Sequence, residues 1–108
     1  MASEQRIQKL NEILEKDPND TFSRYALALE YIGMSDLQTA IDELQKVIQH
    51  DPKYIPGYHQ LGQIFGRLNR TQEAKNIYRK GIDIAQQSGE EKEAKEMREE
   101  LEELEDEW

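Results

Sequence analysis

Apolar residues recur along this chain at the spacing of an α-helix, and the recurrence comes in two matched blocks. One stripe in each block steps by four and then three residues: Leu27, Tyr31 and Met34, and then Leu61, Phe65 and Leu68. A second stripe follows in each block: Ala40, Leu44, Val47 and Ile48, and then Ala74, Tyr78 and Ile82. Because side chains three and four residues apart share one face of a helix, each block predicts two amphipathic helices.

The blocks are bounded by Asp-Pro steps at 17–18 and 51–52, which lie 34 residues apart. Proline has no backbone N–H and disfavours helical geometry in the residue before it, so each step predicts the end of a helix. Between the paired helices, Ser35 and Asn69 each precede a glutamine by three residues, a spacing typical of a helix start. We therefore expect Ser35 and Asn69 to cap the second helix of each block.

The two ends of the chain extend this pattern. Residues 4–16 align with the second helix of the first block, so they predict a half repeat whose first helix is missing. Full repeats are expected at 17–50 and 51–86, and a closing segment at 88–106. Each unit leaves an apolar face open until a neighbour covers it, so we expect residues 1–108 to form one domain.

The closing segment predicts a helix from about residue 90 to 106, with Ser88 as its cap. Its apolar stripe does not match a third repeat: Ala94, Met97, Leu101, Leu104 and, in line with them, Trp108. A third Asp-Pro step would fall at Ala85 and Gln86, where neither residue type stands. The repeats therefore end there, and a closing helix covers the last of them.

These residues resemble the tetratricopeptide repeat family, whose 34-residue unit reads W-x2-L-G-x2-Y, then A-x3-F, then P. The second block matches it at Tyr58, Leu61, Gly62, Phe65, Ala74 and Tyr78. The first block matches at Leu27, Ala28, Tyr31, Ala40, Leu44 and Pro52, and departs at Arg24, which stands at the usual aromatic position. The second block also lacks the final proline. The resemblance implies an all-α fold, a right-handed superhelix of antiparallel helix pairs with about six helices.

The resemblance also implies a function, because first helices in this family line a concave groove that binds peptides or partner segments. Carried over by position, the groove residues of the first block are Phe22, Tyr25, Leu29 and Ile32. Those of the second block are His59, Gln60, Gln63 and Arg67, and the closing helix would add Glu93, Met97 and Glu100. Such a groove would be apolar at one end and acidic at the other, so we expect a partner with apolar anchors followed by basic residues.

Several alternatives stay open at this point. Leu29 and Ile32 fit a core position as well as a groove position, and Tyr25 and His59 fit a structural role as well as a partner-facing one. An exposed apolar face on the helix expected at 21–33 would equally serve a second copy, which makes a self-associating structural protein the rival function. The chain is expected to be a monomer or a weak homodimer. The Lys and Asn clamp by which some relatives hold acidic chaperone tails has no counterpart here.

Charge narrows the range of partners. The net charge is −9, and residues 90–108 carry −8 of it, with 11 acidic and 3 basic residues. Without a basic stripe the chain is not expected to bind nucleic acid or an anionic membrane. The acidic closing segment is either a solvated helix face or a contact for a basic partner. No apolar run is long enough for a signal peptide or a membrane span, so we expect a cytoplasmic protein.

Candidate chemistry is sparse. There is no cysteine, and the two histidines, His50 and His59, fall on separate predicted helices without ligands at metal-binding spacing. No glycine-rich phosphate loop or nucleophile motif occurs. We therefore expect no enzymatic activity, no cofactor and no metal, and a protein–protein interaction module that acts as an adaptor, scaffold or assembly factor.

Overall fold

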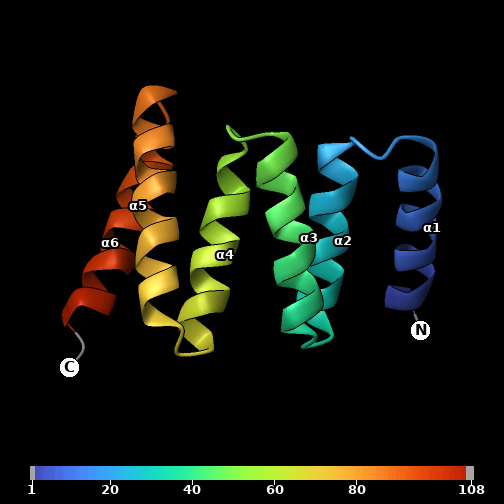
Figure 1. The fold of residues 1–108 in the computed structure, drawn as a ribbon, viewed down its shortest axis with the longest axis horizontal. Coiled ribbons are helices and arrows are strands. Elements are labelled where there is room, and N and C mark those ends of the chain that lie inside the picture. Colours follow the sequence, from blue (N-terminus) through green and yellow to red (C-terminus); the bar gives the residue numbers. More distant parts are fainter. Residues whose placement is uncertain (1, 107–108) are drawn as a thin grey trace. The chain divides into compact units, whose positions relative to one another are not determined.

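A computed structural model describes residues 2–106, and the prediction for Trp108 lies outside this range. The described residues form six α-helices and no strand, which confirms the all-α prediction. The helices, coloured in sequence order in Figure 1, are α1 (Ala2–Lys16), α2 (Thr21–Gly33), α3 (Leu37–His50), α4 (Ile55–Arg67), α5 (Thr71–Gln87) and α6 (Glu91–Asp106).

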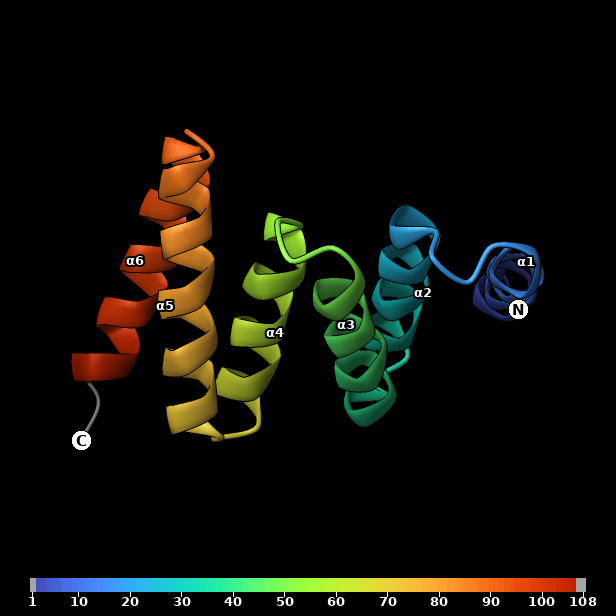
Figure 2. The same ribbon diagram turned by 45° about the horizontal axis from the view of Figure 1, so that its top comes forward.

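The helices group into two compact units, one with α1, α2 and α3 up to Pro52, and one with α4, α5 and α6 from Lys53 onward. Within each unit, successive helices run in opposite directions, as Figure 1 shows. Figure 2 shows the same for α4, α5 and α6. In the first unit α2 packs against α1 and α3, and in the second α5 packs against α4 and α6. The expectation of one domain over residues 1–108 stays a prediction.

The core of the first unit contains Leu27, Ala40, Leu44 and Val47 of the predicted stripes, whereas Met34, predicted for the first stripe, is 48% exposed. Its buried apolar residues are Leu14, Leu27, Ala28, Ala40, Ile41, Leu44 and Val47. They lie on one face each of α1, α2 and α3. Since burial of a Leu, Ile or Val side chain contributes about 1.5–3 kcal/mol, this shared face holds the three helices together.

The core of the second unit is larger and includes aromatic rings. Its buried apolar residues are Ile55, Tyr58, Leu61, Ile64, Phe65, Ala74, Tyr78, Ile82, Ala85, Ala94 and Met97. Met97 is completely buried, so its predicted place in a binding groove is wrong. The apolar stripe of α6 faces α5, and Met97 Sδ would lie 2.8 Å from a Cβ atom at Gly81. Gly81 therefore lets α6 approach α5 closely.

The Asp-Pro steps end helices as predicted, because α1 ends at Lys16 and α3 ends at His50. Ser35 and Asn69 do not cap the following helices, and that prediction is wrong. Both residues adopt left-handed backbone geometry, with φ of 61° and 59°. The N–H of Ser35 donates to the carbonyl of Ile32 at 2.9 Å, and the matching bond runs from Asn69 to Gly66 at 3.1 Å. Each residue thus closes the preceding helix in a Schellman-type turn.

The helix starts use other residues. Asp36 caps α3, and its carboxylate accepts a bond from the backbone N–H of Thr39 at 3.3 Å. Arg70 stands at the same position before α5 and makes no side-chain cap bond. Ser88 ends α5 instead of starting α6, so its predicted role is also wrong. Gly89, with φ of 74°, completes the turn that follows it.

Candidate partner-binding surfaces

The first candidate surface lies on α2 and consists of Phe22, Tyr25 and Leu29, which we call the α2 stripe. The three residues are spaced by three and four positions, so they share one face of the helix. Phe22 is 71% exposed and Leu29 is 38% exposed, whereas Tyr25 is half-buried. Ile32, further along the same helix, is half-buried. Leu29 therefore keeps a surface position and is not enclosed in the core.

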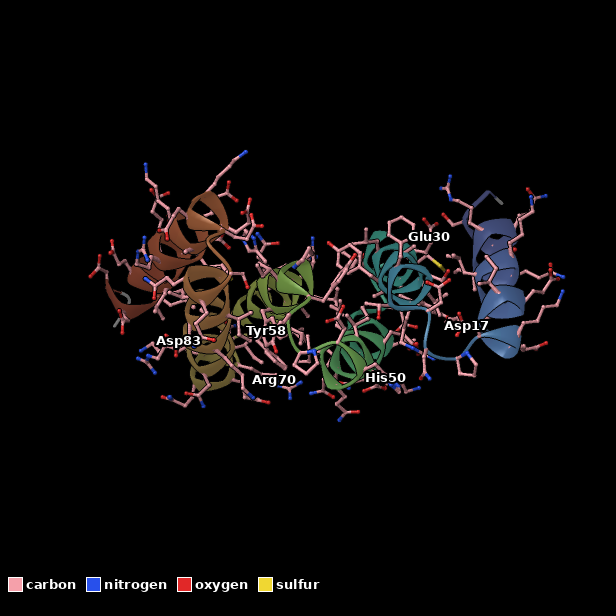
Figure 3. All side chains as sticks on the ribbon, turned by 90° about the horizontal axis from the view of Figure 1, so that it is seen from above. Asp17, Glu30, His50, Tyr58, Arg70 and Asp83 are labelled. Carbon is pink, nitrogen blue, oxygen red and sulfur yellow. The ribbon has the colours of Figure 1, made fainter. Side chains whose placement is uncertain are left out.

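Ion pairs hold α2 against its neighbours in the first unit. Arg24 Nη1 donates to Glu43 Oε1 of α3 at 2.7 Å, and both side chains are largely buried, at 14% and 12% exposed. On the other side, Arg6 Nε of α1 lies 3.2 Å from Glu30 Oε1, the residue labelled in Figure 3. The charges of the first pair are mostly removed from water, so the loss of one partner there should cost more than at the second pair, where Arg6 is 62% exposed.

The second candidate surface lies on α4 and includes four residues predicted for the groove: His59, Gln60, Gln63 and Arg67. Gln63 and Arg67 are exposed and Gln60 is half-buried. The side chain of His59 is 19% exposed. Unlike the α2 stripe, this surface is polar throughout.

A hydrogen-bond network joins the α4 surface to the closing helix, and it centres on Glu100 of α6. Oε2 of Glu100 lies 2.5 Å from Nε2 of His59. Oε1 accepts a bond from the Tyr78 hydroxyl at 2.7 Å and another from Nε2 of Gln63 at 3.1 Å. Glu100 was expected to line the groove, but its hydrogen bonds to α4 and α5 were not predicted from the sequence. Residues 90–106 depart from the 34-residue register, so no repeat position pairs Glu100 with α4 or α5.

The network changes the acidity of its members. Burial raises the pKa of Glu100, but the hydrogen bonds from His59, Tyr78 and Gln63 outweigh burial, so its pKa is lower than usual. Burial also raises the pKa of the Tyr78 hydroxyl, and the bond to the Glu100 carboxylate raises it further. At neutral pH Glu100 is therefore anionic and the Tyr78 hydroxyl is a neutral donor.

An open hollow of about 350 Å³ lies beside this network in the second unit. The residues that line it are Gln63, Gly66, Arg67, Tyr78, Glu100, Glu103 and Leu104. A Cβ atom at Gly66 would meet only Leu104, at 3.9 Å, so packing does not require a glycine there. The hollow offers acidic oxygens, one guanidinium and an apolar wall, which suits a polar side chain of a peptide better than a small-molecule substrate.

The described part of the chain offers no second kind of site. It contains no group of three or more His, Asp or Glu side chains placed to hold a metal ion. Within residues 2–106, no helix has the length and apolar character needed to cross a bilayer. The α2 stripe belongs to the first unit and the α4 surface to the second, so the prediction that they line one groove stays a prediction.

Antiparallel helix pairs that repeat every 34 residues define an α-helical repeat protein. The model of the tetratricopeptide repeat family matches residues 1–104, and the chain belongs to this family. The tetratricopeptide repeat is a protein–protein interaction module.

Individual relatives agree with this placement. A small glutamine-rich tetratricopeptide repeat-containing protein of Mycosarcoma maydis is 34% identical over 80 residues, which are 72% of this chain and 22% of that protein. The chain therefore spans less than a quarter of that relative. A tetratricopeptide repeat domain protein of Salinibacter ruber, solved by NMR, is 33% identical, with a TM-score of 0.77 and coverage of 82% of this chain and 89% of that one.

A second solved structure shares the fold at low identity. The TPR2B domain of yeast Sti1, solved in a complex with pHsp70, is 14% identical to this chain, with a TM-score of 0.84. The match covers 91% of this chain and 78% of that one. Together with the family match, this likeness identifies the helical solenoid architecture.

Proposed function

We propose that this chain is an adaptor, scaffold or assembly factor that binds a protein segment through the exposed faces of its first helices, α2 and α4. The observation that carries the proposal is the α2 stripe. The Phe22 side chain, 71% exposed, and Leu29, 38% exposed, present apolar area to solvent beside the half-buried Tyr25. Aromatic side chains of this kind supply much of the energy of protein interfaces.

The partner segment would carry apolar side chains against the α2 stripe and polar or basic side chains against the α4 surface. Support for the basic component comes from the lining of the hollow beside Glu100, where Glu103 adds a second carboxylate. Support for a peptide ligand comes from the Sti1 domain of the same fold, which was solved as a complex. Charge at this surface would mainly set the choice of partner and the rate of encounter, whereas the α2 stripe would supply affinity.

A second candidate function is self-association through the first unit. Ile13 of α1, 43% exposed, adds apolar surface to that of the α2 stripe. Size-exclusion chromatography with light scattering separates the two functions. The measured masses of wild type and of Phe22→Ser are compared at high concentration. If both are the mass of a monomer, the homodimer is ruled out.

The adaptor function is tested by affinity capture from the native cell, followed by mass spectrometry. The variant Phe22→Ser with Leu29→Ser removes the exposed apolar part of the α2 stripe. The matched control is Met34→Ser with Leu68→Ser, because these residues are 48% and 39% exposed and lie at helix ends outside the stripe. We expect the stripe variant to lose specific partners that the control variant retains. Equal capture by both variants would contradict the proposed surface.

A further inference from the structure

The geometry points to Glu100 as a positioning residue that latches α6 onto α4 and orients His59 and Gln63. This inference rests on the proposed function only in that His59 and Gln63 belong to the proposed α4 surface. The latch itself is a property of the second unit without any partner.

Helix α6 buries little apolar surface. Only Ala94 and Met97 are buried, while Leu101 and Leu104 remain partly exposed. Most of the other residues of α6 are acidic. The contact of α6 with the rest of the unit therefore depends on polar interactions more than the α4–α5 contact does.

Glu100 makes the strongest of those polar interactions. A second side-chain contact of α6 with α5 joins Arg79 Nη2 to Glu105 Oε2 at 3.0 Å, and these two side chains are 50% and 44% exposed. Exposed ion pairs contribute little to stability. Glu100 is 29% exposed and accepts from donors on both α4 and α5. Bonds to a charged acceptor in a partly dry site are the stronger kind.

The contacts of Glu100 also orient polar side chains on the α4 surface. The contact with Glu100 occupies Nε2 of His59, and that nitrogen must carry a proton to donate to a carboxylate. The contact also directs the amide nitrogen of Gln63 toward α6, which leaves its amide oxygen for other bonds. A helix outside the repeats therefore determines which polar atoms α4 presents.

Binding of a partner at the α4 surface should therefore be coupled to the packing of α6. A partner that takes the proton donors of His59 or Gln63 competes with Glu100 for them and must loosen α6. By thermodynamic reciprocity, loosening α6 changes the affinity for that partner by the same factor. The titratable groups around Glu100 are His59 and Arg67 from α4, Tyr78 from α5 and Glu103 from α6.

The experiment compares Glu100→Gln with Glu103→Gln by amide hydrogen exchange on the full chain. Both changes remove one negative charge from the same helix and the same hollow, but only Glu100 accepts bonds from α4 and α5. We expect amide exchange in α6 to be about tenfold faster in Glu100→Gln and unchanged in Glu103→Gln. Exchange in α1, α2 and α3 provides the internal reference and should not change.

A second readout separates positioning from general destabilisation. In NMR spectra of Glu100→Gln, the imidazole signals of His59 and the side-chain amide signals of Gln63 should shift, and those of Gln60 should not. If Glu100→Gln fails to fold, Tyr78→Phe removes one donor without changing charge, and α6 should again exchange faster than in wild type. Equal exchange in the two glutamate variants, or unchanged His59 and Gln63 signals in the variant that folds, would overturn the inference.

Discussion

The helix pairs α2–α3 and α4–α5 share one register of 34 residues but fill equivalent core positions with side chains of different size. In the first pair the residues at these positions are Ala28 and Leu44, and both are completely buried. In the second pair the equivalent residues are Gly62 and Tyr78, and a Cβ atom at Gly62 would lie 2.5 Å from the Tyr78 ring. A larger side chain on one helix is thus matched by a smaller one on the other. The two repeats therefore have a similar combined side-chain volume at these two positions, although the individual residues differ.

A second difference concerns the position at which the family usually has an aromatic residue. In α4 this residue is Tyr58, which is 2% exposed and is labelled in Figure 3. In α2 it is Arg24, and Glu43 of α3 supplies the opposite charge where α5 has Ile77. The same place between two helices is therefore filled by an aromatic ring in one unit and by an ion pair in the other.

The outer faces differ more than the cores do. The α2 stripe of Phe22, Tyr25 and Leu29 corresponds in α4 to Pro56, His59 and Gln63. The first set is apolar and aromatic, and two members of the second set bond to Glu100 of the closing helix. One fold thus presents two different chemistries on equivalent helices, which is the basis of the proposed partner with apolar and polar parts.

The largest effect is expected from breaking the ion pair of the first unit. Arg24→Leu leaves the Glu43 carboxylate mostly buried with only Lys46 nearby, at 3.6 Å. We expect the free energy of unfolding, measured by urea denaturation, to fall by about 2–3 kcal/mol. The double change Arg24→Tyr with Glu43→Ile copies the second unit and should recover most of that loss. The single variants Arg24→Tyr and Glu43→Ile provide the comparison. If the double variant loses as much stability as these two variants lose together, the two units are not interchangeable at this position.

The next effect is expected at the close approach of α4 and α5. Gly62→Ala places a methyl group against the Tyr78 ring, so one of the two helices must shift. We expect a loss of about 1–2 kcal/mol in the free energy of unfolding, despite the better helix propensity of alanine. Gly33→Ala is the control, because a Cβ there meets no neighbouring atom within 4 Å. If both variants are equally stable, volume matching does not govern the pair.

A smaller effect separates the starts of α3 and α5. Asp36→Ala removes the side-chain bond to the N–H of Thr39, and we expect it to cost about 1 kcal/mol in the free energy of unfolding. The equivalent Arg70 makes no cap bond; instead its guanidinium lies 4.7 Å from the ring centroid of Phe65. Arg70→Ala should therefore leave the start of α5 intact. Circular dichroism during urea denaturation measures both changes.

The smallest effect on the free energy of unfolding near neutral pH is expected from Glu100→Gln. Its pKa is lower in the folded protein than in the unfolded chain, so its contribution is complete above the usual carboxyl pKa of about 4.3. The contribution is lost as the pH falls through the lowered pKa. We expect the stability difference between wild type and Glu100→Gln to be constant from pH 7 to 5 and to shrink in stronger acid. A difference that grows on acidification would contradict the direction of the shift.

Much of the fold follows from the sequence because helix periodicity and proline act locally. The stripes led by Leu27 and Leu61 identify the first helices, and the Asp-Pro steps identify where α1 and α3 end. The caps at Ser35 and Ser88 were predicted wrongly for a physical reason. Serine at a helix boundary can accept a bond from the next helix or close the preceding one, and only the backbone geometry distinguishes these roles.

The surface was harder to predict than the core. Met97 was assigned to the groove because an apolar residue on the closing helix fits either face until the rotation of α6 is known. The rotation follows from Gly81, whose missing side chain makes room for Met97. The Glu100 network joins residues of α4, α5 and α6, so no local sequence pattern predicts it.

The central claim is that this chain works by binding a protein partner at the α2 stripe. The most direct measurement places a photoreactive amino acid at Phe22 in one variant and at Gln45, exposed on α3, in another, and cross-links each in the native cell. We predict a discrete partner cross-linked from position 22 and not from position 45. Cross-linking of the same partner from position 45 alone would contradict the claim.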